Sequence, residues 1–176
     1  MELKDVRGRS SVDYMLRTTQ QHHVQLSFMA DQKANIVIAF SSVVFTVSIT
    51  QIAGERLLWA FPVLAMFSGV ALVFAIQSVF PRYRRQDHKR IGIALNPLFF
   101  GHFTEVSFEE YKGRMARVMS DDTLLYEAVL LDIYQIGHVL KNKKYRYLKM
   151  SYQISWLGLV AALATLFVQM VLHLMP

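Results

Sequence analysis

Three stretches of the chain contain no charged residue, and they set the fold class. They cover 34–54, 57–81 and 151–176. A helix rises ~1.5 Å per residue, so about 20 apolar residues cross the ~30 Å hydrocarbon core of a bilayer. Each stretch is therefore long enough to span a membrane. The first lies behind a polar segment of mixed charge, which is unlike a cleaved signal peptide, and the short gap before the second predicts a hairpin of two membrane helices.

The polar segments also carry helical patterns. Residues 10–33 have apolar and weakly polar side chains at helical spacing, and neither Gly nor Pro separates them from the first stretch, so we expect one helix over about 11–52. Ser107 opens a capping box before a short helix at about 107–118. Ser120-Asp121-Asp122 caps another helix, which should continue into the third stretch over about 50 residues. Its expected apolar stripe is Leu125, Val129, Ile133, Ile136 and Leu140, with Leu124, Ala128 and Leu131 beside it.

These patterns predict an all-α membrane protein. Three transmembrane helices should carry a small cytoplasmic helical bundle, made by helix extensions and the short capped helix. The expected segments are an amphipathic N-terminal helix at 1–33, transmembrane helices at 34–54, 57–81 and 153–175, and a cytoplasmic helical region at 82–152. Asn96-Pro97 should end any extension of the second membrane helix, because the residue before Pro avoids helical geometry.

Charge predicts the orientation. All of the 19 basic residues except Arg56 lie in 1–33 and 82–153. Basic residues near membrane ends stay on the cytoplasmic side. We therefore expect a multi-pass protein of the bacterial inner membrane with a cytoplasmic N-terminus and a periplasmic C-terminus.

Composition narrows the function. Hydrophobic residues make up 53% of the chain, charged residues 18%, and cysteine is absent. The apolar stretches argue against a soluble enzyme, and the lack of cysteine excludes disulfide scaffolds and thiolate chemistry. The six histidines are not at metal-ligand spacing, and no catalytic motif is visible. We expect no enzymatic activity, no metal and no cofactor.

Several polar residues stand at or inside the first membrane stretch. Asp31, Lys33 and Asn35 lie at its start, where a carboxylate so near hydrocarbon needs a partner. A structural interpretation pairs Asp31 with a basic residue of 82–152, and a functional one makes Asp31, Lys33, Asn35 and Asn96 coupling or gating residues. Asn35, Ser42, Thr46 and Thr50 form a stripe that either packs between helices or lines a water path in an oligomer.

Basic residues alternate with tyrosines just outside the second and third stretches, at 82–85 and 143–147. Arg and Lys can hold phosphate, and an aromatic ring can stack on a base. The structural alternative is topogenic charge in contact with anionic lipid. Binding of nucleic acid is not expected beside an anionic membrane.

The order of motifs resembles the Pycsar effector transmembrane proteins (PycTM). The resemblance rests on 30–34 entering a membrane helix, on the sequence Asn-Pro-Leu-Phe-Phe-Gly at 96–101, on Ser107-Phe108 to Tyr111, on 120–122, and on Lys144-Tyr145 before the last membrane helix.

The resemblance implies a bacterial anti-phage effector. In that family, infection triggers synthesis of cyclic CMP or cyclic UMP, and the effector then impairs the inner membrane, so that the cell stops growing or dies. A cyclic pyrimidine mononucleotide is then the expected ligand, in a homo-oligomer embedded in the bilayer. Its phosphate would be held by Arg84, Arg85, Lys144 and Arg146, and its base would stack on Tyr83 or Tyr145. The alternatives are an adaptor that docks a cytoplasmic protein, and a small channel.

Overall fold

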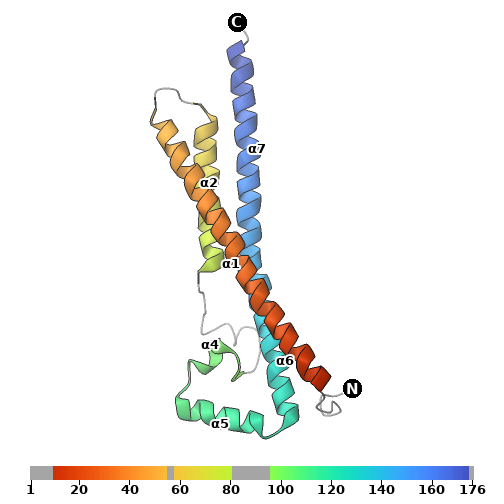
Figure 1. Cartoon of the computed structure of the whole chain (residues 1–176). Helices are drawn as coiled ribbons and strands as arrows, with labels where there is room; N and C mark the ends of the chain where they lie inside the picture. The colour runs from red at the N-terminus through yellow and green to blue at the C-terminus, as the bar shows by residue number, and fades with distance from the viewer. Residues whose placement is uncertain (1–9, 55–57, 81–95, 175–176) are drawn as a thin grey trace. The chain divides into compact units, whose positions relative to one another are not determined.

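The computed structural model describes residues 10–54, 58–80 and 96–174, and every element in these ranges is a helix (Figure 1). No strand occurs among them, so the predicted all-α class is confirmed. The helices are α1 (Ser10–Ile52), α2 (Ala60–Val79), α4 (Phe100–Phe103), α5 (Phe108–Met119), α6 (Asp122–Val139), the π-helix η2 (Leu140–Tyr145) and α7 (Arg146–Leu174). Three helical runs are long and apolar enough to cross a membrane: α1, α2 and the run from Asp122 to Leu174.

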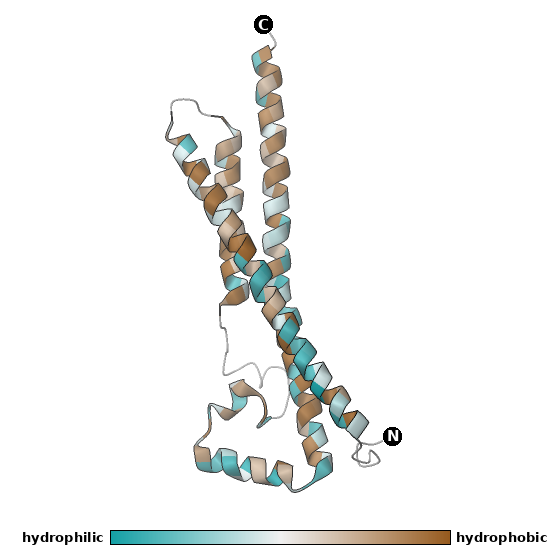
Figure 2. Cartoon of the chain, in the orientation of Figure 1, coloured by the Kyte–Doolittle hydropathy of each residue, from teal (hydrophilic) through white to brown (hydrophobic). Residues whose placement is uncertain are grey.

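Helix α1 is continuous, as its sequence predicts. It contains no Gly or Pro over its 43 residues, so nothing interrupts the backbone hydrogen bonds. Figure 2 shows the change along it from a mostly hydrophilic first part to a mostly hydrophobic second part.

Both predicted helix caps form. The Ser107 hydroxyl accepts a hydrogen bond from the Glu110 amide at 3.3 Å, and α5 begins at the next residue. The Asp121 carboxylate accepts from the Thr123 amide at 2.7 Å at the start of α6. Each side chain satisfies an amide that the first helical turn leaves without an intrahelical partner.

The long helix into the third apolar stretch contains a feature that the sequence did not predict. Between α6 and α7 the backbone forms six residues of π-helix, Leu140–Tyr145. A π-turn widens the helix and changes which side chains share a face on either side of it; such turns occur often at functional sites. The run from Asp122 to Leu174 is therefore helical throughout, but it is not one regular α-helix.

The chain divides into two compact units. The membrane unit comprises 27–80 and 141–176, and within it α2 and α7 run side by side, with the second part of α1 crossing them (Figure 1). The extramembrane unit comprises 1–26 and 81–140.

In α2 and α7 most of the buried residues are small, and the exposed residues of their apolar stretches are apolar. The buried positions of α2 are Ala60, Ala65, Ser68, Ala71, Ala75 and Ser78, and those of α7 are Leu148, Ser151, Gly158 and Ala162. The exposed residues of α2 and those of α7 between 156 and 172 are all apolar. Small residues let helices approach closely in lipid, while apolar side chains face the hydrocarbon. This arrangement is that of a membrane protein.

Helices α2 and α7 approach each other closely at Gly158. A Cβ added there would overlap the Cβ of Phe67 and lie 2.9 Å from its Cγ. Gly158 and Ala162 lie four residues apart on α7, and both are buried.

The extramembrane unit differs from the expected apolar bundle. Helix α6 buries Tyr126, Ala128, Asp132 and Gln135. Of the predicted stripe, Leu125 is exposed and was wrong, while Leu140 is buried and the three members between them, Val129, Ile133 and Ile136, are half-buried. The buried face turns polar because the residues of α1 that meet it are themselves polar. The predicted extension of the second membrane helix lies outside the described residues.

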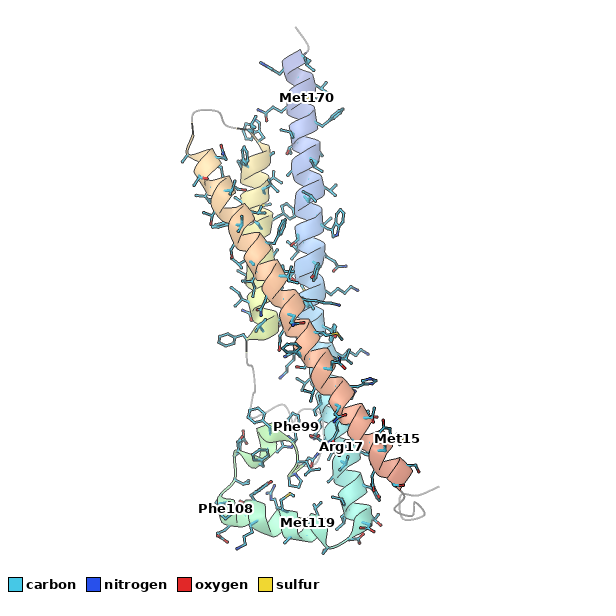
Figure 3. All side chains as sticks on the ribbon, in the orientation of Figure 1. Met15, Arg17, Phe99, Phe108, Met119 and Met170 are labelled. Atoms are coloured by element: carbon cyan, nitrogen blue, oxygen red, sulfur yellow. The ribbon has the colours of Figure 1, made fainter. Side chains whose placement is uncertain are left out.

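Helix α5 packs beside α6 but has no buried residue. Phe108 and Met119, at its two ends, are largely exposed (Figure 3). Its apolar side chains therefore remain available on the surface of this unit.

Candidate functional site

In the membrane unit, a charged side chain of the π-helix η2 meets a charged side chain of α1. The Nζ of Lys144 lies 2.8 and 2.7 Å from the two carboxylate oxygens of Asp31, and it donates to the Ser27 hydroxyl at 2.8 Å. All three ammonium donors are thus used. Asp31 was predicted to pair with a basic residue of 82–152, and Lys144 is that residue. The pair is half-buried, so it is less screened than a surface ion pair.

The π-helix positions this lysine. Lys144 is the fifth of its six residues, and its own carbonyl accepts a hydrogen bond of 3.1 Å from the Ser78 hydroxyl of α2. In an apolar surrounding, side-chain hydroxyls commonly satisfy the backbone groups that an irregular helix frees. Lys144 therefore contacts α1 through its side chain and α2 through its backbone.

The other residues predicted near this site lie differently. The ring of Tyr145 packs against a buried cluster of Ala30, Ala34 and Leu148, where it contributes to the helix packing. Arg146, Lys33 and Asn35 are exposed. Tyr83, Arg84 and Arg85 lie outside the described residues.

Asn96, in the extramembrane unit, is almost fully buried and bonded at every polar group of its side chain. Its amide nitrogen donates to the Ala128 carbonyl at 3.0 Å, and its side-chain oxygen accepts from the Leu98 amide at 3.0 Å. Its backbone amide donates to Nδ1 of His102 at 2.9 Å. These bonds tie the turn at 96–98 to α6, which is a structural role; the coupling role stays a prediction.

A buried polar cluster between α1 and α6 was missed at the sequence level. Gln20 donates to the Asp132 carboxylate at 2.9 Å, and His23 lies close enough to attract the same carboxylate. Burial raises the pKa of Asp132 above its usual value, although Gln20 and His23 act in the opposite direction. Nδ1 of His23 and Oε1 of Gln135 are buried without a hydrogen-bond partner in the described part of the chain.

Such a cluster opposes stability, because a buried polar atom without a partner costs about 1–3 kcal/mol. Groups that a fold keeps at such a cost are candidates for function. A sequence signal existed: Asp132 and Gln135 interrupt the apolar run of α6 three residues apart, on one helical face. His23 of α1 lies at the interface with α6, beside Asp132 and Gly137.

The membrane unit also holds an apolar cavity of about 390 Å³ between its three helices. Its walls come from the 36–44 part of α1, the 64–68 part of α2 and the 152–159 part of α7. Ser41, Ser68 and Ser155 are its small polar residues, and Ser68 and Ser155 hydrogen-bond to backbone carbonyls of their own helices. The cavity has no charged residue and offers nothing to a phosphate.

Comparison of the sequence with protein families identifies the family of this chain. The Pycsar effector protein domain matches residues 14–172, which includes all three membrane-spanning helices. The chain belongs to the Pycsar effector family. No curated protein and no solved structure matches it.

The Pycsar effector is thus a transmembrane protein of anti-phage defence, a role connected with cyclic nucleotide signalling. The matched range contains the Asp31–Lys144 pair and the Asp132 cluster. Both are therefore within the effector domain.

Proposed function

We propose that this Pycsar effector is a non-enzymatic switch that binds cyclic CMP or cyclic UMP and then impairs the inner membrane, causing growth arrest or death of the infected cell. The observation that supports the proposal is the Asp31–Lys144 pair. It links α1 to the π-turn that precedes α7, so a ligand that competes for Lys144 acts directly on two membrane helices.

The chemistry of the exchange is simple. A cyclic mononucleotide carries one phosphate charge, as Asp31 carries one carboxylate charge, and the ammonium of Lys144 can bind either. Arg146 is exposed two residues further on, and Arg84 and Arg85 are further candidate phosphate ligands. When the phosphate takes Lys144, Asp31 loses its partner, and the contact between α1 and α7 weakens.

The energies required are within reach. A shift from 1:99 to 99:1 between resting and active states needs about 5.5 kcal/mol of differential binding. Two charge-assisted hydrogen bonds at about 1.5–3 kcal/mol each and one stacked base at about 1–3 kcal/mol can supply it.

Calorimetry on the purified protein in detergent, with cyclic CMP and cyclic UMP, tests the proposal. Lys144→Gln should weaken binding at least about tenfold, which is about 1.4 kcal/mol. Lys149→Gln is the matched control, because Lys149 is an exposed lysine five residues away and should bind as the wild type does. No heat with either nucleotide on a folded sample would refute direct binding.

An adaptor is the second candidate, and helix α5 is the observation that favours it. Its exposed Phe108 and Met119 could dock a protein partner, as amphipathic helices often do. An adaptor predicts no response to nucleotide and no growth arrest by the chain alone, so the same calorimetry and a growth assay separate the two functions.

A further inference from the structure

The exposed surface of α1 in the membrane is unlike that of its neighbours. Among the described residues, α2 exposes only apolar side chains, and α7 does so between 156 and 172. Helix α1, in contrast, exposes Asn35, Thr46, Thr50 and Gln51, and Ser42 is half-exposed. Polar side chains that face lipid are costly, so they usually face protein or water instead.

The exposed surface of α1 separates into two faces within 34–47. One, the lipid face, consists of Ile36, Phe40, Val43 and Val47, which are large and apolar. The other consists of Asn35, Ala39, Ser42 and Thr46, at spacings of four, three and four residues, which places them on one side of the helix. These side chains are small or polar, as at contacts between membrane helices.

Before residue 34, the side of α1 that continues this second face carries exposed apolar side chains instead of polar ones. On that side lie Val24 and Phe28, whose exposures are 63% and 59% although they lie in the hydrophilic part of α1. Between Phe28 and Asn35 the same side carries Asp31, which is paired with Lys144. We call the whole set, 24, 28, 35, 39, 42 and 46, the outer stripe. The side of the helix that continues the lipid face carries mostly polar residues there, His22, Gln25 and Lys33, together with the apolar Met29.

The outer stripe is thus apolar where α1 is hydrophilic and polar where α1 is hydrophobic. Exposing the apolar half to water and the polar half to lipid both cost free energy. A single partner that covers both halves removes both costs. The Ser42 hydroxyl donates to its own backbone at Ile38, but the Asn35 amide and the Thr46 hydroxyl have no hydrogen-bond partner in the described residues.

We infer that a second copy of the chain packs on the outer stripe, with α1 parallel to α1. Copies inserted with the same topology present the stripe in the same direction, so equivalent residues meet. The stripe is self-complementary: an Asn amide is both donor and acceptor, and a Thr hydroxyl likewise, so each can pair with its own equivalent. Ala39 and Ser42 leave room for close approach, and Val24 and Phe28 pack together outside the hydrocarbon.

Cysteine crosslinking tests the interface directly, because the native chain has no cysteine. Single substitutions Ala39→Cys, Ser42→Cys and Thr46→Cys report on the outer stripe, and Val43→Cys and Val47→Cys on the lipid face. In oxidised membranes without nucleotide, at least one stripe position should form a disulfide-linked dimer about tenfold faster than either control, since the bond needs Cβ atoms about 4 Å apart.

A second measurement covers the case in which a cysteine variant disturbs packing. Two differently tagged copies should co-purify from membranes, and the pair Asn35→Leu with Thr46→Leu should reduce co-purification severalfold, while Val43→Leu should not. Equal crosslinking on both faces, or no crosslinking together with no co-purification, overturns the inference. Because nucleotide is not needed, this result is independent of whether cyclic CMP or cyclic UMP binds.

Discussion

Lys144 shows how one residue can contact two neighbouring helices. Its ammonium bonds to Asp31 and Ser27 on α1, while its carbonyl accepts from Ser78 on α2. Half-burial makes the pair worth more than an exposed one, because solvent and salt screen it less.

A double-mutant cycle measures that difference. We expect Asp31→Asn and Lys144→Gln, singly and together, to give a coupling energy of at least about 1 kcal/mol in thermal unfolding of the detergent-purified protein. The pair Glu110–Arg114, at 2.6 Å within α5, is the matched control and should give about 0.3–0.5 kcal/mol. Equal coupling energies in the two cycles would show that the Asp31–Lys144 pair stabilises the fold no more than an exposed ion pair does.

Asp132 gives a pH-dependent prediction. Burial raises the pKa of Asp132 in the folded state, so the fold binds its proton more tightly than the unfolded chain does. The associated stabilisation is present below the unfolded pKa of about 3.9 and is lost as pH rises through the folded pKa. Near neutral pH the charged carboxylate therefore opposes folding.

Asp132→Asn should accordingly keep or raise the melting temperature at neutral pH, because the amide oxygen can still accept a hydrogen bond from Gln20. The variant should also show a smaller decrease of the melting temperature between mildly acidic and neutral pH, because it lacks the titrating carboxyl group. Asp132→Ala leaves Gln20 unpaired and should lower the free energy of unfolding by about 1–3 kcal/mol. Differential scanning fluorimetry at several pH values measures both. A lower melting temperature for Asp132→Asn at neutral pH would mean that the charge itself stabilises the fold.

At the scale of elements, the three membrane helices are held by small residues. Gly158 allows α7 to contact Phe67 of α2, which no larger residue permits at this separation. The π-turn at Leu140–Tyr145 is the other irregular feature of the long helix, and it carries the lysine of the ion pair.

Gly158→Ala tests the helix contact. The added methyl group forces α2 and α7 apart, and overpacking of this kind costs about 1–3 kcal/mol, so the melting temperature in detergent should fall. Gly113→Ala is the control: nothing lies within 4 Å of a Cβ there, and in α5 alanine should keep or raise stability by about 0.5–1 kcal/mol. The same loss in both variants would point away from helix packing as the cause.

At the scale of the whole molecule, topology follows from charge. All basic residues but Arg56 lie outside the short hairpin turn, in segments expected to be cytoplasmic. A reporter that is active only in the periplasm should be active when it is fused after Pro176. A reporter that is active only in the cytoplasm should be active when it is inserted near Ser120. The reverse pattern would overturn the orientation and, with it, access of a cytoplasmic nucleotide to Lys144.

The sequence by itself determined the helical class, the three spans, the continuity of α1 and the caps at Ser107 and Asp121. These follow from hydropathy, from the absence of Gly and Pro, and from side-chain bonds to backbone amides two or three residues away, all of which are local. The need for a partner at Asp31 could also be read locally, because it depends on one charge beside hydrocarbon.

Only the tertiary structure decided that the partner is Lys144, that a π-turn presents it, and that α6 buries the polar Asp132 and Gln135 while Leu125 is exposed. Likewise, the polar residues of α1 could be counted in the sequence, but their exposure could not. Each of these outcomes depends on how helices distant in sequence rotate and approach one another. That rotation is set by the sum of many packing contacts, and no local pattern encodes it.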